Sequence, residues 1–243
     1  MSPMTTRPGQ ESRAKPTRRR HWWRWAVGGV VALVVLAVAA AIVVVELTPE
    51  PAPLALPAGA VVAPVGQLDG TWQVTGGSLA GFRVRESILG IGNDVTGRTS
   101  DVTGTLVATG GEIVSATFRI SLDTITVNGK ARQPQLVESL GTAAHPIAKV
   151  TLSRPLPLPA AFSAGGTVRW RGAAALTLNG VTRPVTVTLA ARRDGTTIEA
   201  AGSLPIAFVD FGVKGPAGYG FLGSLADSGT AEFLLILTPA AAA

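Results

Sequence analysis

Few residues in this chain have side chains suited to catalysis. The 243 residues include no Cys and two His, His21 and His145. A Ser/His/Asp set would have to use His145, because His21 precedes a long apolar segment. His145 stands directly before Pro146, which favours an extended or turn backbone, and no Gly-x-Ser-x-Gly motif is present. We interpret His145 as a loop histidine and expect no enzyme; a hydrolase that depends on His145 is the catalytic alternative.

The composition also argues against a metal site or a bound cofactor. With one His and no Cys after residue 21, a metal would need several carboxylates, and the acidic residues are scattered singly. The glycine-rich stretch 212–223 contains Lys214, but no strand, loop and helix unit surrounds it. We interpret this stretch as a loop at the rim of a β domain.

The charge of the chain is concentrated at its N-terminal end. The formal net charge is +6 and the isoelectric point is about 10.7. Residues 1–65 hold seven Lys/Arg against three acids, whereas residues 66–243 hold fourteen against twelve. A nucleic-acid binder needs a concentrated basic surface, so the nearly neutral larger part excludes that class.

An apolar stretch indicates a membrane anchor. Residues 25–45 contain no charged side chain, and 21 helical residues at about 1.5 Å each span a bilayer core of roughly 30 Å. Arg18, Arg19 and Arg20 precede the stretch and Glu46 follows it, which predicts a cytoplasmic tail over 1–24. We expect a single-pass protein of the cytoplasmic membrane with its C-terminal domain outside. A cleaved signal peptide, or a twin-arginine export signal, is the alternative for this segment.

The segment after the predicted anchor is rich in proline and alanine. Residues 46–68 carry prolines at 49, 51, 53, 57 and 64. Proline fixes φ and lacks an N–H, so we expect an extended linker that holds the following domain away from the headgroups.

From residue 69 to 239 the pattern of apolar residues has a period of two, which is typical of strands with one buried face. Residues 116–122 alternate strictly, and similar runs occur at 174–178 and 185–189. The dipeptides Asn179-Gly180 and Asp194-Gly195 are hairpin signals. About eight antiparallel strands result, in a sandwich or a closed barrel, and Pro134 favours a short helix within 131–140.

The order of several motifs resembles the YceI-like polyisoprenoid-binding family. These motifs are Trp72 with Phe82 and Val84, the strand ending at 123–125, Arg132 followed by Leu136, His145-Pro146, and above all the strand, turn and strand at 172–187. The resemblance covers roughly residues 69–238 and implies an all-β, eight-stranded, lipocalin-like antiparallel barrel with a short helix. The chain departs from the family pattern at Gln133 and Lys149.

The resemblance also implies that the barrel holds the chain of a polyisoprenoid, an isoprenoid quinone or a similar amphiphile, without a separate cofactor. Arg132 is the expected contact for the headgroup. The function that we predict is binding or carrying of such a lipid outside the cytoplasmic membrane. The alternative is a non-catalytic envelope interaction module with a filled barrel. The apolar residues expected to line the cavity are Phe82, Val84, Phe118, Ile120, Leu122, Leu136, Leu176, Leu178, Val185, Val187, Leu189, Phe233 and Leu235.

Overall fold

A computed structural model describes Leu33, Leu36 and residues 51–88, 91–127, 142–213 and 223–241. The chain divides into two compact units, Met1–Pro49 and Glu50–Ala243. Within the predicted anchor 25–45 only Leu33 and Leu36 are described, and both are helical and exposed. Among the described residues, no helix has the length and apolar character needed to cross a membrane.

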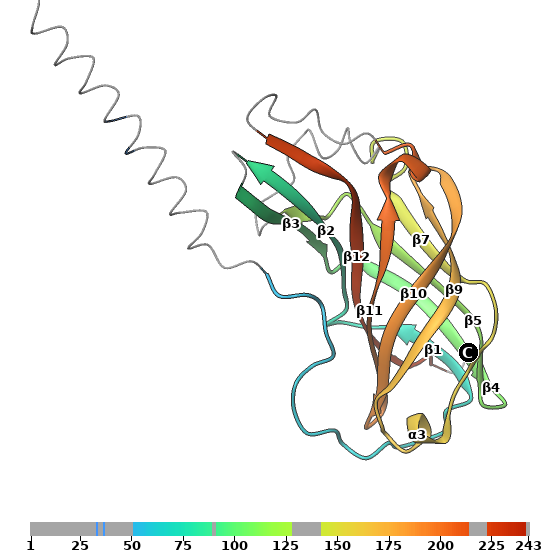
Figure 1. The fold of residues 1–243 in the computed structure, drawn as a ribbon. Coiled ribbons are helices and arrows are strands. Elements are labelled where there is room, and N and C mark those ends of the chain that lie inside the picture. The colour runs from blue at the N-terminus through green and yellow to red at the C-terminus, as the bar shows by residue number, and fades with distance from the viewer. Residues whose placement is uncertain are drawn as a thin grey trace, which may run out of the picture. The chain divides into compact units, whose positions relative to one another are not determined.

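The second unit is built from antiparallel strands (Figure 1). A four-residue helix, α3 (Ala160–Ser163), and a 3-10 turn, η1 (Phe208–Phe211), accompany them. The predicted helix at 131–140 lies outside the described residues, so α3 is a different element. The strands are β1 (Gly70–Val74), β2 (Leu79–Ile88), β3 (Ile91–Thr99), β4 (Val102–Thr109), β5 (Glu112–Ser121), β6 (Thr126–Val127), β7 (Ile147–Leu152), β8 (Leu156–Pro157), β9 (Val168–Leu178), β10 (Val181–Asp194), β11 (Thr197–Ala207) and β12 (Gly223–Pro239).

The sheet closes on itself, which confirms the predicted eight-stranded barrel. The hydrogen-bonded ring runs β1-β4-β5-β7-β9-β10-β11-β12, and β12 pairs with β1 to close it. The 17-residue β12 is long enough to pair with β1 near its C-terminal end and with β2 further up. The remaining strands β2, β3 and β6 extend the sheet beyond this ring. A few residues separate β2 from β1, β3 from β4, and β6 from β5 along the chain. In Figure 1 the long β12 lies between β11 and β2. Closure removes the exposed edges that an open sheet would present.

Both predicted hairpins are present. Leu178 pairs with Val181 across the Asn179-Gly180 turn, and Asp194 pairs with Thr197 across the turn that contains Gly195. Asn179 and Gly180 have φ values of 49° and 73°. A turn with positive φ at both central residues matches the twist of the two strands that it joins, which explains the Asn-Gly pair here.

The proline-rich segment is part of the folded unit. Residues 51–68, which we call the strap, contain no helix or strand, as an extended chain should. They are nevertheless hydrogen-bonded to β2, β3, β10, β12 and the β10–β11 turn. The strap is therefore held against the barrel and belongs to the compact unit Glu50–Ala243.

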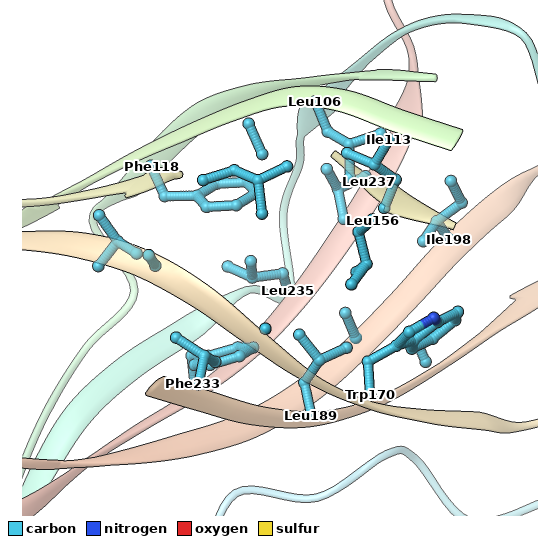
Figure 2. A pocket seen from close by; sticks show the side chains of 18 of the residues that line it. Leu106, Ile113, Phe118, Leu156, Trp170, Leu189, Ile198, Phe233, Leu235 and Leu237 are labelled. Atoms are coloured by element: carbon cyan, nitrogen blue, oxygen red, sulfur yellow. The ribbon is translucent and has the colours of Figure 1, made fainter. Parts of the chain in front are cut away.

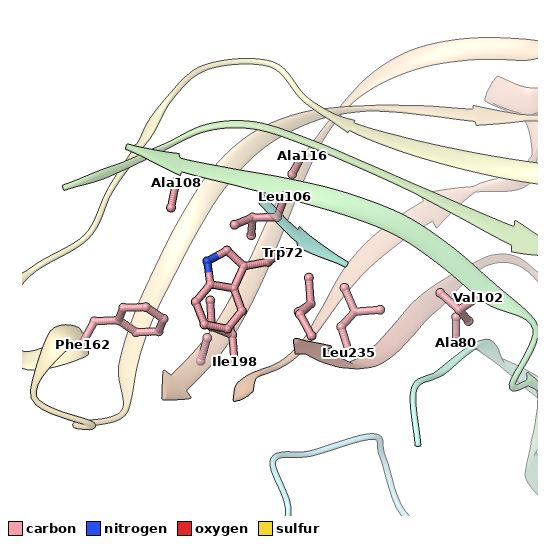
Figure 3. Packing of buried hydrophobic residues seen from close by; sticks show 11 residues of the cluster. Trp72, Ala80, Val102, Leu106, Ala108, Ala116, Phe162, Ile198 and Leu235 are labelled. Carbon is pink, nitrogen blue, oxygen red and sulfur yellow. The ribbon is translucent and has the colours of Figure 1, made fainter. Parts of the chain in front are cut away.

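The interior of the barrel contains two groups of buried apolar residues. The first, the cavity cluster (Figure 3), consists of Trp72, Ala80, Val102, Leu106, Ala108, Ala116, Phe162, Ala191, Ile198, Leu235 and Leu237. The second, the filled cluster, consists of Leu122, Ile125, Ala148, Ala174, Leu176, Leu178, Val187, Leu204, Ile206, Phe211 and Val213.

Candidate functional site

A cavity of about 140 Å³ lies inside the barrel. Its lining contains only apolar residue types, and the one nitrogen-bearing side chain, Trp170, donates its Nε1–H to the carbonyl of Pro157 (2.9 Å). The side chains converge on the hollow from opposite walls (Figure 2). The lining residues are Leu68, Ala80, Val102, Leu106, Ala108, Ile113, Ala116, Phe118, Ile120, Val150, Leu152, Leu156, Leu158, Phe162, Trp170, Gly172, Ala173, Ala174, Val187, Leu189, Ala191, Ile198, Ala200, Leu204, Phe233, Leu235 and Leu237.

Small residues at inward positions create the hollow. Along β9, burial alternates, and Gly172 and Ala174 follow Trp170 on the inward side. On the neighbouring strands Ala191 and Ala200 are directly opposite each other in the register. Protein interiors are otherwise packed nearly without voids, so small side chains on adjoining strands leave space that larger neighbours do not fill.

An aromatic pair borders the cavity. Phe162 of α3 packs edge-on against Trp170 of β9, with ring centroids 5.5 Å apart and planes at 72°. Both residues line the cavity, and neither was among the predicted lining residues. The alternation of residues 168–178 could have identified Trp170 as an inward residue. Phe162 lies on a four-residue helix, which is too short to show a period.

The predicted lining residues separate into three groups. Six of them, Phe118, Ile120, Val187, Leu189, Phe233 and Leu235, line the cavity. Leu122, Leu176 and Leu178 are buried in the filled cluster, Phe82 and Val185 pack against that cluster, and Val84 is buried on β2 outside the cavity lining. Leu136 and the predicted headgroup contact Arg132 lie outside the described residues.

The remaining candidates lie away from the cavity. His145 is exposed, in the loop before β7, and its ring approaches Gly180 of the neighbouring hairpin. Lys149 sits between Arg119 and Thr177 in the register, whereas its neighbours Ala148 and Val150 are in the barrel core. The departure from the family pattern at Lys149 therefore affects the outer wall. Across the described ranges, no three His, Cys, Asp or Glu residues come together as a metal site would require.

Two groups of charged residues on the barrel hold the strap. In the first, Arg83 Nε donates to Glu232 Oε1 (2.8 Å) and its Nη2 donates to the carbonyl of Pro51 (2.6 Å). Glu232 also accepts the N–H of Leu54 (3.3 Å), and Arg98 donates to the carbonyl of Ala52. Burial disfavours the charged guanidinium of Arg83, but hydrogen bonds and charges of Glu232 and Asp94 outweigh it and raise the pKa of Arg83 above its ordinary value.

The second group lies at the β10–β11 hairpin. Arg192 and Glu199, each 8% exposed, are cross-strand partners with Nε 2.8 Å from Oε2, and Arg192 Nη2 donates to the carbonyl of Pro57 (2.8 Å). Arg193 is 4% exposed and donates from Nη2 to the carbonyls of Val65 (3.0 Å) and Gly66 (3.1 Å). Its Nε has no hydrogen-bond partner among the described residues.

Comparison with known proteins identifies this architecture. A family model described as "YceI-like domain" matches residues 72–234. The chain belongs to the YceI-like domain family. A search among curated proteins finds no match.

A solved structure supports the fold. A polyisoprenoid binding domain from Saccharophagus degradans, implicated in plant cell wall breakdown, is 21% identical, with a TM-score of 0.53 over 70% of this chain and 98% of that one. BcnA from Burkholderia cenocepacia is 19% identical, with a TM-score of 0.48 over 65% of this chain and 95% of that one. At 21% identity, the similarity to the Saccharophagus degradans domain supports the fold alone. The YceI-like resemblance predicted from the sequence is confirmed.

Proposed function

We propose that this YceI-like barrel binds the apolar chain of a polyisoprenoid, such as an isoprenoid quinone, or of a similar amphiphilic lipid. The observation that carries the proposal is a hollow without a polar side chain, enclosed by a closed sheet. Each methylene group transferred from water to such a site contributes about 0.8 kcal/mol. No catalytic group is needed for this function, and the proposal includes none.

The volume of the cavity limits the size of the ligand that fits without movement of the lining. Its volume of about 140 Å³ is close to that of an engineered apolar cavity of about 150 Å³ that admits benzene. The hollow therefore accepts a group about as large as one ring, and a chain of several isoprene units requires the lining to move outward. The family relationship and the polyisoprenoid-binding domain from Saccharophagus degradans support the longer ligand.

A filled barrel that serves as an envelope interaction module is the second candidate. The small volume of the hollow and the tight packing of the filled cluster favour it. The two candidates differ in one measurable property, because only the lipid-binding barrel loses its ligand when the hollow is filled with side chains.

The proposal includes a location. The uncharged stretch 25–45, with basic residues before it, supports an anchor in the cytoplasmic membrane and a barrel outside it. Fusion of a reporter that is active only outside the cytoplasm to residue 241 should give activity, and the full chain should stay in the membrane fraction after an alkaline wash. Release into the soluble fraction would contradict the anchor.

The ligand can be tested by extraction of the full-length chain. The double variant Ala116→Leu/Ala191→Leu adds side-chain volume at two lining positions, and Thr188→Leu adds the same apolar group on the exposed side of β10. Wild type and Thr188→Leu purified from membranes should yield an isoprenoid by mass spectrometry, and the double variant should not. Ordinary phospholipid should come from all three equally. Equal isoprenoid recovery from the double variant would favour the interaction module.

A further inference from the structure

The strap is held almost entirely by polar contacts. Its carbonyls accept hydrogen bonds from Arg83, Arg98, Arg192 and Arg193, and its N–H groups donate to Glu232 and Asp194. None of residues 51–68 is fully buried, and most are exposed. A segment with few buried apolar contacts opens locally at a small free energy, so the strap can leave the wall while the barrel stays folded.

The end of the strap reaches the cavity. Leu68 lines the hollow, and its carbonyl accepts the Nε1–H of the buried Trp72 (2.9 Å). Just before it, Val65 and Gly66 are held by Arg193. Gly66 and Gly70 flank Leu68 with φ values of 81° and 135°, a range that favours glycine and suits hinge positions.

Arg193 connects the strap to the cavity wall. It follows Ala191 on the inward face of β10 and is the register partner of Ile198, and both of those residues line the hollow. Its guanidinium is buried with no carboxylate within ion-pairing distance among the described residues, and its only hydrogen bonds go to the strap. Arg193 therefore contributes two bonds to neutral carbonyls, in addition to the hydrogen bonds that Val62 and Val65 make with Asp194 and Gly195. Bonds of this kind break more readily than a paired ion bridge.

We propose that the strap is the gate of the lipid cavity: release of residues 62–68 from Arg193 and from the β10–β11 turn withdraws Leu68 and opens the hollow to an isoprenoid chain. This inference rests on the proposed function and adds the entry route to it. It also explains how a closed barrel with a cavity of only about 140 Å³ receives a larger ligand. The gate residues are Val65, Gly66 and Leu68 of the strap and Arg193 of the wall.

The absence of cysteine from the chain allows a reversible lock. A Cβ built at Gly195 would lie 3.8 Å from the Val62 Cβ, which matches the mean Cβ separation of about 3.8 Å in disulfides. In the double variant Val62→Cys/Gly195→Cys, oxidation should tie the strap to the turn and reduction should free it. The two single variants carry the same substitutions without the bond and serve as controls.

The measurement is the rate at which the full chain in nanodiscs takes up tritiated geranylgeraniol from vesicles. The Ala116→Leu/Ala191→Leu variant serves as the background, because geranylgeraniol can then enter only the lipid of the nanodisc. The oxidised double variant should load at least about tenfold more slowly than the reduced form, because the disulfide holds residue 62 at the β10–β11 turn and restrains the release of the residues that follow it. The single variants should not respond to oxidation.

Release of the gate provides the opposite test. Arg193→Met removes the two bonds from Arg193 to Val65 and Gly66, leaves the bonds to the β10–β11 turn in place, and should speed loading by about tenfold. Arg171→Met, at an exposed position of β9, should leave the rate unchanged. Equal loading by the oxidised and reduced double variants would overturn the gate and leave lipid binding intact. If wild type takes up no more geranylgeraniol than the filled variant, both the proposed function and the gate fail.

Discussion

The two clusters inside the barrel differ in whether they surround the hollow. The cavity cluster surrounds the hollow, and all its members except Trp72 line it; of the filled cluster, only Ala174, Val187 and Leu204 do so. The cavity cluster has alanine at four positions, 80, 108, 116 and 191, whereas the filled cluster has two, Ala148 and Ala174, and Ala174 lines the hollow. Small side chains are therefore concentrated around the hollow. One closed sheet can thus combine a filled part with a part that has room for a ligand.

Strand β9 shows the transition within one element. Its inward positions run from Trp170 through Gly172 and Ala174 to Leu176 and Leu178. The first three line the cavity, and the two leucines belong to the filled cluster. If the filled cluster stabilises the fold and the cavity cluster binds the ligand, substitutions at equivalent depth should have separate effects on stability and on binding.

The largest effect is expected from Leu176→Ala in the filled cluster. Leu176 is 4% exposed and does not line the cavity. Truncation of a buried leucine costs about 2–5 kcal/mol, since it loses apolar burial and leaves a void. Urea unfolding of the variant should show this loss, while isoprenoid recovery from the folded protein stays at the wild-type level. Loss of the ligand from a fully folded Leu176→Ala protein would show that the clusters are not separate.

The ligand itself should stabilise the protein through the cavity cluster alone. At a ligand concentration of 100 times Kd, binding to the native state adds about 2.7 kcal/mol. Thermal unfolding of wild type with geranylgeraniol should therefore shift upward, and the shift should be absent from Ala116→Leu/Ala191→Leu. Thr188→Leu, altered on the outside of β10, should shift as wild type does. A shift that persists in the filled variant would place the ligand elsewhere.

Replacement of one alanine by leucine in each cluster tests whether the clusters differ in free space. Ala148 on β7 belongs to the filled cluster and does not line the cavity, whereas Ala191 on β10 does. Ala148→Leu should destabilise by about 1–3 kcal/mol, as overpacking does. Ala191→Leu should destabilise by less, because the added carbons enter space that is already present. Equal losses of unfolding free energy in the two variants would mean that the hollow closes when the protein is free of ligand.

The sequence predicted the strands better than it predicted the hollow. Alternation alone identified the inward faces that include Phe118 and Ile120, and Asn179-Gly180 predicted the β9–β10 hairpin. Alternation does not report where small side chains from separate strands meet, so Ala191 and Ala200, opposite each other in space, carried no signal. Phe162 was missed because α3 is too short for a period to show.

The strap shows a second limit of prediction from sequence. Its prolines predicted an extended linker, and residues 51–68 contain no helix or strand. The partners that dock the strap lie far along the chain: Arg192 is 135 residues from Pro57. The adjacent residues Arg192 and Arg193 have different surroundings. Arg192 faces outward to Glu199 and the strap, and Arg193 occupies the inward face. Such pairings depend on the closed register of the barrel, which no local pattern encodes.

The smallest expected effect concerns the aromatic pair at the edge of the cavity. Phe162→Leu removes the edge-on contact with Trp170 but keeps an apolar side chain at a lining position. Aromatic pairs of this geometry contribute about 0.5–1.5 kcal/mol beyond their buried area, so urea unfolding should show a loss of that order. The smaller side chain enlarges the hollow, and isoprenoid recovery should therefore be equal to or greater than that of wild type. A variant that lost its ligand while keeping its stability would instead make the Phe162 ring a specific contact for the isoprenoid chain, and binding would then depend on the shape of the aromatic wall as well as on apolar space.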